Sequence, residues 1–247
     1  MQTAELVKKL GVNVFLNNEK VVRDADLIIV TLKPYIVINV LNSLSNLLRG
    51  KIVVSAASLI PLSSYVSILK DCEVYRIMPN VNVEVNKGFI ALSGNKGDNA
   101  KLVEEVFSML GDVVWVDEDV LNKLTIISAS IPALIVELID AMELAALYLG
   151  IPHNLARRAV IKSLIGTAEL AEIKDLVSIR NSIITPRGIT IKLLRKYMNL
   201  NIKSSIMETL IYASEELDKL LEMFNKENEK HIITNLNVKD NSSIRIS

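Results

Sequence analysis

The residues with the clearest chemical potential lie in the segment 178–190, whose sequence is SIRNSIITPRGIT. This segment interrupts a helical pattern, and a new helix is expected to begin at its end. The backbone N–H groups of Gly188, Ile189 and Thr190 then lie in the opening turn of a helix, where unpaired donors and the positive end of the helix dipole favour an anion. The segment therefore predicts a carboxylate-binding turn. By spacing alone, the hydroxyl of Thr185 or Thr190 also suits an ordinary helix cap.

Two further polar side chains directly follow expected strands. Lys33 follows the uncharged run 27–32, and Asn80 follows the run 73–77. Ligands of open α/β sheets bind at the carboxyl ends of the strands, so both side chains are candidates for ligand contact. A solvated loop lysine and a turn asparagine are the alternative interpretations.

The first half of the chain alternates strands with helices. Short apolar runs predict strands at 12–15, 27–32, 51–57, 73–77, 88–93 and 113–116, and amphipathic patterns predict helices at 3–10, 17–25, 36–48, 61–69 and 99–110. This alternation implies right-handed crossovers and a parallel sheet. The fold class is therefore α/β.

A long apolar segment, 119–150, organises the second half. Its apolar residues cover nearly the whole circumference of a helix that would be about 45 Å long, and a second chain is the natural cover for it. A membrane span is the rival interpretation, but Glu137, Asp140 and Glu143 interrupt the apolar run, and a span needs about 20 apolar residues.

Pro132 lies inside this segment and predicts a helix start or a kink there, because an interior proline costs a helix about 3 kcal/mol. Ser128 and Ser130 are then candidate N-caps. Further helices are expected at 152–172, 191–198 and 204–224. We therefore expect an incomplete ligand-binding domain at 1–117, a helical domain at 118–225, and a flexible tail at 226–247 that is rich in Asn, Lys and Ser.

The overall composition narrows the class of partner. The chain has 28 basic and 28 acidic residues and a pI of about 6.8, which gives no global attraction to nucleic acid or to an anionic membrane. The single Cys72 and the two histidines, His153 and His231, provide neither an intrachain disulfide nor a metal site. No secretory signal pattern opens the sequence. We expect a cytoplasmic protein with a small-molecule or protein partner.

One expected feature of a dinucleotide-binding sheet is absent from the sequence. No G-x-G-x-x-G pattern occurs in the 247 residues, and the glycines at 94 and 97 follow a different pattern. The run 27–32 is apolar on both faces and should have a strand on each of its edges. We therefore expect the first strands of the sheet to lie upstream of Met1 or to come from another chain.

Several motifs resemble those of the pyrroline-5-carboxylate reductase family, in the same order. They are TLKP at 31–34 for A-V-K-P, SAA at 55–57 for I-A-A-G, RIMPN at 76–80 for R-x-M-P-N, GFIAL at 88–92 for G-x-x-A-L, GDVVWV at 111–116 for G-x-V-x-x-V, SASIPA at 128–133 for S-G-S-G-P-A, and ITPRGIT at 184–190 for T-S-P-G-G-T-T. The resemblance implies a Rossmann-like domain followed by a helical domain that interlocks in a homodimer or an assembly of dimers. It also implies reduction of 1-pyrroline-5-carboxylate to L-proline with NADPH or NADH, the last step of proline synthesis.

The resemblance also implies roles for the candidate residues. Thr190 matches the catalytic position beside the substrate ring, and Gly188 and Ile189 join it in holding the substrate carboxylate. Arg187 could add a charged contact to that carboxylate, and Ser130 would line the substrate pocket. Lys33 and Asn80 would contact the cofactor, with the Asn80 amide bonding to nicotinamide or ribose. No metal is implied.

Several positions depart from the family pattern. Arg187 replaces a glycine, Ile189 replaces a threonine, Asn181 stands for an aspartate, Ser58 replaces the glycine of A-A-G, and Ile131 and Leu134 replace the glycine and tyrosine around the S-G-S-G-P-A proline. The segment that would hold the pyrophosphate and select NADH or NADPH is not in the sequence. Two alternatives to the reductase therefore remain open: a non-catalytic dimeric relative, acting as a scaffold or regulator, and a reductase of a different imine.

Overall fold

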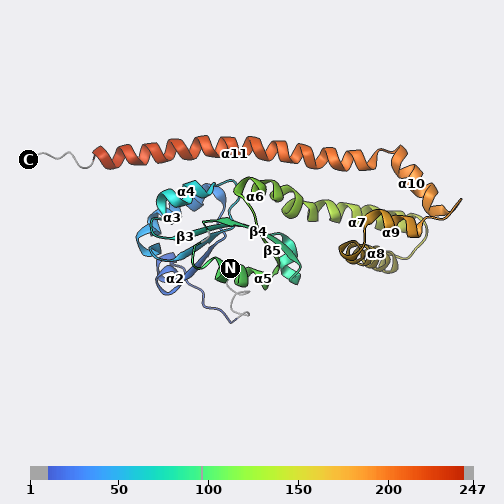
Figure 1. Cartoon of the computed structure of the whole chain (residues 1–247), viewed down its shortest axis with the longest axis horizontal. Helices are drawn as coiled ribbons and strands as arrows, with labels where there is room; N and C mark the ends of the chain where they lie inside the picture. Colours follow the sequence, from blue (N-terminus) through green and yellow to red (C-terminus); the bar gives the residue numbers. More distant parts are fainter. Residues whose placement is uncertain (1–10, 96, 242–247) are drawn as a thin grey trace, which may run out of the picture. The chain divides into compact units, whose positions relative to one another are not determined.

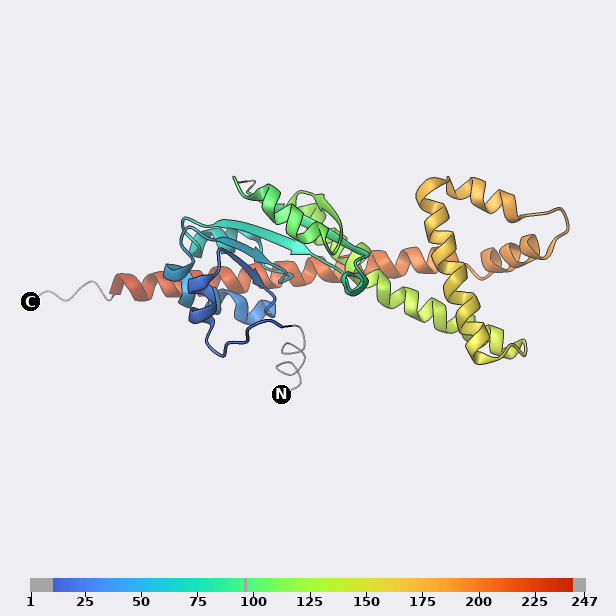
Figure 2. The same cartoon turned by 90° about the horizontal axis from the view of Figure 1, so that it is seen from below.

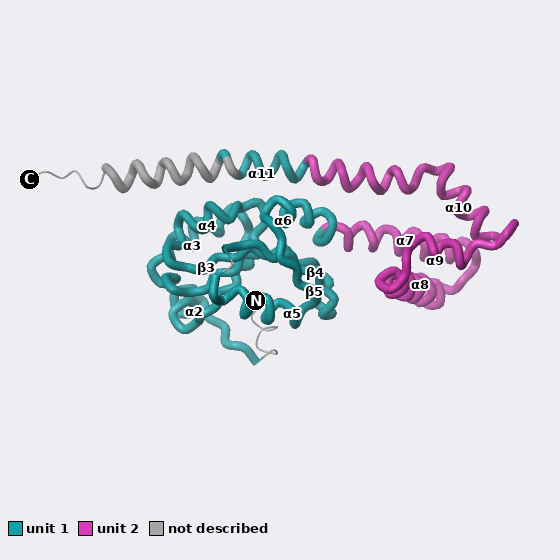
Figure 3. Tube along the Cα trace, viewed as in Figure 1, with its two compact units in different colours: residues 1–129, 216–247 teal, residues 130–215 magenta. Residues whose placement is uncertain are grey.

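The computed structural model describes residues 11–95 and 97–241 (Figure 1). The chain forms two compact units (Figure 3): unit 1 comprises Met1–Ala129 and Glu216–Ser247, and unit 2 comprises Ser130–Glu215. We expected the boundary between 117 and 118. The observed boundary lies later because helix α6 (Glu118–Leu124) packs on the sheet of unit 1, where Leu121 is buried beside Met78 and Ala91.

Unit 1 contains a five-stranded sheet in the order β1-β2-β3-β4-β5. The strands are β1 (Leu27–Val30), β2 (Ile52–Ser55), β3 (Glu73–Met78), β4 (Gly88–Gly94) and β5 (Gly111–Trp115). Strands β1, β2 and β3 are parallel, and their register aligns Ile28 with Val53 and Val53 with Val74. The predicted α/β class is confirmed, and five of the expected strand positions form strands.

The direction of β4 differs from our expectation. It pairs with β3 in the antiparallel direction, while β5 returns parallel to β4 through helix α5 (Ala100–Ser108). A parallel pair needs a crossover of about a dozen residues or more. Only a single 3₁₀ helix, η1 (Val81–Val85), separates β3 from β4, so the chain turns back instead of crossing over.

Helices cover both faces of this sheet (Figure 1; Figure 2). One face packs against helices α2 (Asn18–Asp24), α3 (Pro34–Leu48) and α4 (Leu62–Ile68), and the other against α5. Alternate residues of β2 point to opposite faces of the sheet: Val53 lies in the first core, and Ile52 and Val54 lie in the second. Because β2 is buried on both faces, its sequence is apolar at successive positions from Ile52 to Val54.

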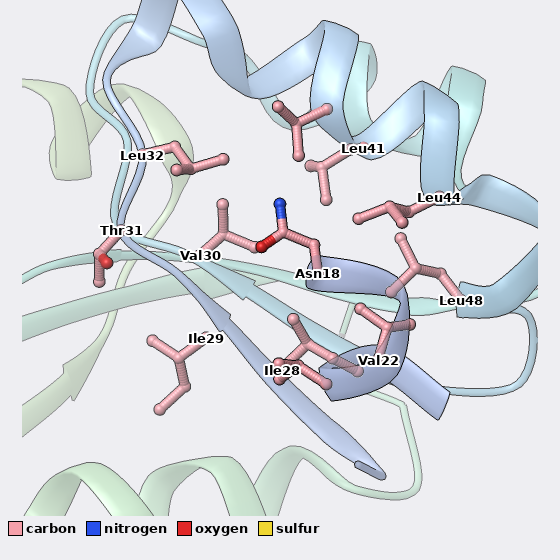
Figure 4. A pocket seen from close by; sticks show the side chains of 12 residues that line it. Asn18, Val22, Ile28, Ile29, Val30, Thr31, Leu32, Leu41, Leu44 and Leu48 are labelled. Atoms are coloured by element: carbon pink, nitrogen blue, oxygen red, sulfur yellow. The ribbon is translucent and has the colours of Figure 1, made fainter. Parts of the chain in front are cut away.

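Strand β1 has a paired neighbour on only one edge among the described residues, namely β2. A cavity of about 170 Å³ lies beside it, lined almost entirely by apolar side chains of α2, β1 and α3 (Figure 4). The strand expected at 12–15 does not form: these residues have no regular secondary structure and are exposed. Strand hydrogen bonds need an adjacent strand, and none of the described strands lies beside this segment.

Unit 2 is entirely helical. It contains α7 (Ile131–Tyr148), α8 (His153–Ile173), α9 (Leu176–Ile183), α10 (Ile189–Asn199) and the first part of α11 (Ile202–Asn241). Helix α8 packs against α7 (Figure 2). The segment 178–190, expected to interrupt the helices throughout, is helical up to Ile183 because Asp175 caps α9 by accepting a hydrogen bond from the Ser178 N–H at 2.9 Å.

Helix α11 extends to Asn241, through residues that we expected to form a flexible tail. The Lys and Glu residues of this stretch are good helix formers. The prediction of a flexible tail rested on the bias toward Asn, Lys and Ser and did not take this helix propensity into account. The second part of α11 belongs to unit 1, where Phe224 packs against the core between α3 and the sheet.

Glu73 joins the start of β3 to the start of α5. Its carboxylate accepts hydrogen bonds from the Tyr75 hydroxyl at 2.7 Å, from the Asn99 backbone N–H at 3.1 Å and from the Asn99 side-chain amide at 2.9 Å. Burial raises the pKa of the Glu73 carboxyl, but the hydrogen bonds outweigh burial and hold this pKa below its ordinary value. Folding therefore stabilises the ionised form.

We expect Glu73 to make stability depend on pH in the acid range. Because its pKa is lower in the folded state than the unfolded value of about 4.3, its contribution is present above that value and is lost as the pH falls through the folded pKa. Urea unfolding from about pH 6 to about pH 3 should show the difference in free energy between the parent and Glu73→Gln shrinking as the pH falls. Glu84→Gln, at an exposed position of η1, is the control. A difference independent of pH would contradict this account.

Candidate active site

The turn that precedes α10 has a geometry set by Thr185, Arg187 and Gly188. The Gly188 N–H donates to the Thr185 carbonyl at 3.0 Å, which closes the turn over Pro186 and Arg187. Arg187 adopts a φ of 61°, a left-handed conformation that favours glycine at the third position of such a turn. A Cβ on Gly188 would overlap the Thr185 side chain, so this close approach requires glycine.

Helix α10 begins directly after this turn. Gly188 occupies the N-cap position without a side-chain cap, and no acidic residue lies in the first turn. The first N–H groups of the helix have no helical acceptor. Thr190 lies inside the helix and is half-buried, so its hydroxyl is not the N-cap. Of the two interpretations offered by the sequence, an ordinary cap and a substrate contact, the geometry removes the N-cap role for Thr190 and leaves its hydroxyl for another use.

The candidate residues at the sheet occupy the carboxyl end of the parallel strands. Lys33 is exposed and precedes α3 as its N-cap residue, without a side-chain cap bond. Asn80 follows β3, and its side-chain amide is already engaged: Nδ2 donates to the Ser128 carbonyl at 3.3 Å and Oδ1 accepts from the Phe89 N–H at 3.4 Å. The predicted contact between the Asn80 amide and a cofactor therefore competes with two protein hydrogen bonds.

Ser128 and Ser130 lie in η2 (Thr125–Ser130), a π-helical stretch that joins α6 to α7. The hydroxyl of Ser128 donates to the Phe89 carbonyl at 3.4 Å, and Ser130 makes no cap bond to α7. Neither serine therefore has the expected role of N-cap. The helix runs on from α6 through η2 into α7, and the predicted distortion near Pro132 takes the form of a π-helical turn.

Arg76 is a structural residue that sequence reasoning did not single out. Its side chain is 1% exposed, and its guanidinium donates to the Glu118 carboxylate and, at 3.1 Å, to the Asn122 side-chain oxygen. The same Glu118 oxygen accepts from the Leu62 N–H at 2.6 Å. The sequence signal for this role was an arginine inside the apolar strand EVYRIM, because a charged side chain buried in a sheet needs a hydrogen-bonding or charged partner. Arg76 and Asn80, both from the RIMPN motif, thus hold the helix at Glu118, Asn122 and Ser128.

The candidate residues divide between the two units. Lys33 and Asn80 belong to unit 1. They follow β1 and β3, so both lie at the carboxyl ends of the parallel strands, with β2 between these two strands. The remaining candidates belong to unit 2: Ser130, Arg187, Gly188, Ile189 and Thr190. The structure brings the last four together in one turn and helix start.

The described residues do not form a cradle for a dinucleotide pyrophosphate. Such a cradle needs a glycine-rich turn between a strand and the N-terminus of a helix. The turn after β1 is Thr31–Lys33, without glycine, and Ser55 at the end of β2 is buried and hydrogen-bonded to the Tyr65 hydroxyl at 2.8 Å. Burial raises the pKa of Tyr65, which keeps this phenol protonated. The turns after β1 and β2 therefore do not provide a binding site for the pyrophosphate of a dinucleotide.

The fold defines the class of protein: an α/β domain with a five-stranded sheet, combined with a helical domain. Residues 1–58 match the family described as NADP oxidoreductase coenzyme F420-dependent, and residues 118–220 match pyrroline-5-carboxylate reductase dimerisation. A pyrroline-5-carboxylate reductase of Methanosarcina acetivorans is 31% identical over 87% of this chain and 83% of its own length. The chain belongs to the pyrroline-5-carboxylate reductase family, as the resemblance predicted.

Solved structures agree with this assignment. A pyrroline-5-carboxylate reductase of Coxiella burnetii superposes with a TM-score of 0.80 at 25% identity, over 89% of this chain and 85% of that one. The Plasmodium falciparum enzyme with NADP bound has the same fold, with a TM-score of 0.78 at 24% identity over 85% and 82% of the two chains. The predicted use of NADP or NAD is confirmed at the level of the family.

The continuous helix Glu118–Tyr148 is long and apolar enough to span a membrane by length and composition, and little of it is buried in the single chain. The match to a dimerisation family covers this helix. The family match supports homo-oligomerisation, and that a second subunit covers this helix stays a prediction.

Proposed function

We propose that the protein reduces 1-pyrroline-5-carboxylate to L-proline at the expense of NADPH or NADH, as a homodimer or an assembly of dimers formed through its helical domain. The observation that carries the proposal is the 31% identity with the Methanosarcina acetivorans reductase over most of both chains. The turn Thr185–Gly188 and the start of α10 support it, because they combine unpaired N–H donors, a positive helix end and a hydroxyl at Thr190.

In this proposal the chain's own residues bind and orient the cyclic imine. The N–H groups of Ile189 and Thr190 hold the ring carboxylate, and the exposed Arg187 adds a charged contact from the turn. The Gly188 N–H donates to the Thr185 carbonyl, so Gly188 contributes by shaping the turn. The Thr190 hydroxyl hydrogen-bonds the ring nitrogen, which gains a proton during the reaction. Ser130 lines the pocket. Holding the imine in one orientation supplies most of what the protein must contribute to such a transfer.

The test is turnover of 1-pyrroline-5-carboxylate by the purified chain and by the same chain carrying a fused glycine-rich strand–turn–helix segment ahead of Met1. Loss of the absorbance of NADPH or NADH at the rate of proline formation supports the proposal. Absence of proline formation by both forms, with dinucleotide bound by the fused form, refutes it.

We expect the 247-residue chain alone not to bind a dinucleotide with micromolar affinity, because the turn that cradles pyrophosphate is not in its sequence. Calorimetric titration with NADPH and with NADH measures this directly, and the fused form is the positive control. Micromolar binding to the unmodified chain would reveal a different phosphate site and would contradict this expectation.

Arg187→Gly should separate the two contributions of Arg187. Glycine tolerates the positive φ of this turn, so the free energy of unfolding should not fall and should rise by up to about 1 kcal/mol. If Arg187 holds the ground-state carboxylate, KM for the imine rises while kcat changes little. Arg187→Lys is the matched control that keeps the charge. A rise in kcat/KM with Arg187→Gly would show instead that Arg187 obstructs the pocket.

A non-catalytic dimeric relative, acting as a scaffold or regulator, is the second candidate function. The observation that favours it is the lack of a pyrophosphate cradle among the described residues and of the glycine fingerprint in the sequence. A dimer that turns over no imine in either form would support this alternative. The substituted pocket positions Arg187, Ile189, Ile131 and Leu134 also favour assaying other cyclic imines.

A further inference from the structure

Helix α6 contacts the sheet through three residues on one side, Glu118, Leu121 and Asn122. Residues three and four positions apart lie on the same face of an α-helix, and Leu121 is fully buried there beside Met78 and Ala91. Apolar packing of this kind is non-directional. It therefore holds the helix against the sheet but specifies the rotation of the helix about its own axis only weakly.

Arg76 of β3 supplies the directional contacts. One terminal nitrogen, Nη1, donates to the Glu118 carboxylate, and the other, Nη2, donates to the Asn122 side-chain oxygen at 3.1 Å. A guanidinium is planar and rigid, so its two terminal nitrogens hold two successive turns of one helix in fixed positions. The same Glu118 oxygen accepts from the Leu62 N–H at 2.6 Å, which ties this point to the start of α4 as well.

Stability alone does not account for a buried arginine at this position. The side chain is 1% exposed, and its buried Nε has no hydrogen-bond partner among the described residues. Replacing both members of a buried ion pair with uncharged side chains of similar size often leaves a protein equally stable, whereas removing one member is costly. The directional bonds are the part of this arrangement that uncharged side chains do not reproduce.

We infer that Arg76 is a positioning residue that fixes the rotation of α6 about its axis, and with it the direction of the side chains in the turns that follow. The helix is continuous from Glu118 to Tyr148, and Ser130 lies within it, eight residues after Asn122. The consequence for the substrate rests on the proposed function, in which Ser130 lines the pocket. The effect on the helix stands without that function.

The experiment separates the charge of Arg76 from its two-pronged geometry. Arg76→Met leaves Glu118 without its cation, and Arg76→Met combined with Glu118→Gln removes both charges but keeps an oxygen for the Leu62 N–H. Arg76→Lys keeps the charge without the planar fork. Arg49→Met is the matched control, because Arg49 pairs with Asp71 at 3.9 Å on the surface, where both side chains are exposed.

The first readout compares global stability with local hydrogen exchange. We expect Arg76→Met to lower the urea midpoint of unfolding and the double variant to restore most of it. Exchange of the peptide 119–130 should nevertheless be faster by about tenfold in Arg76→Met, in Arg76→Lys and in the double variant, the effect of one lost hydrogen bond. Arg49→Met should change neither quantity.

Two results of this comparison would overturn the inference. Exchange that returns to the parent rate in the double variant would show that Arg76 acts through stability alone. Exchange at the parent rate in Arg76→Lys would show that a single charge near Glu118 is sufficient, and that the contact with Asn122 fixes nothing.

The second readout is steady-state kinetics of a form that turns over 1-pyrroline-5-carboxylate. Arg76→Met, Arg76→Lys and the double variant should each raise KM for the imine by about tenfold and leave kcat nearly unchanged, whereas Arg49→Met should behave as the parent. A double variant with the parent KM would overturn the positioning role toward Ser130. If the parent has no reductase activity, the proposed function fails, and hydrogen exchange alone decides the inference.

Discussion

Replacing Leu138 with aspartate is expected to prevent dimer formation. Leu138 lies on α7 with Ile135 and Met142 at helical spacing, and all three are exposed in the single chain. A dimer that covers this face would bury an unpaired carboxylate, at a cost of about 4 kcal/mol or roughly a thousandfold in Kd. Sedimentation analysis from nanomolar to micromolar concentration measures the change.

The matched control is Leu102→Asp, which makes the same substitution at an exposed position of α5 in unit 1. It should leave the dimer intact. A parent protein that is a folded monomer at micromolar concentration would contradict the proposed assembly, and a dimeric Leu138→Asp variant would place the interface elsewhere.

Replacing Thr190 with alanine is expected to lower kcat/KM for 1-pyrroline-5-carboxylate by about 5- to 150-fold, which corresponds to one hydrogen bond of about 1–3 kcal/mol in the transition state. The hydroxyl is not used as the N-cap of α10, since Gly188 occupies that position, so its removal should leave the helix in place. The comparison is made in the form of the protein that binds the dinucleotide.

Thr190→Ser is the matched control and should retain most of the activity, because it keeps the hydroxyl. Urea unfolding of both variants establishes that stability is unchanged. An unchanged kcat/KM for Thr190→Ala would remove Thr190 from the site and would favour the non-catalytic alternative.

Much of the sheet domain could be predicted because strands buried on both faces leave continuous apolar runs. The runs at 27–32 and 51–57 contain β1 and β2. The direction of β4 could not be read in this way, because a strand has the same apolar pattern in either direction. The segment 12–15 also has a strand-like composition, but whether it forms a strand depends on a neighbour that its own residues do not specify.

The part of the candidate site that depends on local backbone conformation could be predicted from the sequence. The turn at Thr185–Gly188 was visible from Pro186 and Gly188, and the structure forms a turn there, directly before α10. The competing use of the Asn80 amide was not visible, because its partners Phe89 and Ser128 are distant in sequence. The role of Arg76 depends on Glu118 and Asn122 in the same way.

Helix α11 begins in unit 2 and ends in unit 1, so unit 1 is encoded by two separate stretches of the gene, with the single stretch that encodes unit 2 between them. A truncation after residue 129 would produce a sheet domain without the helix that carries Phe224, and would leave part of the apolar core near α3 open to solvent. Exchange of the dimerisation domain between relatives by recombination therefore requires two crossover points, one on each side of unit 2.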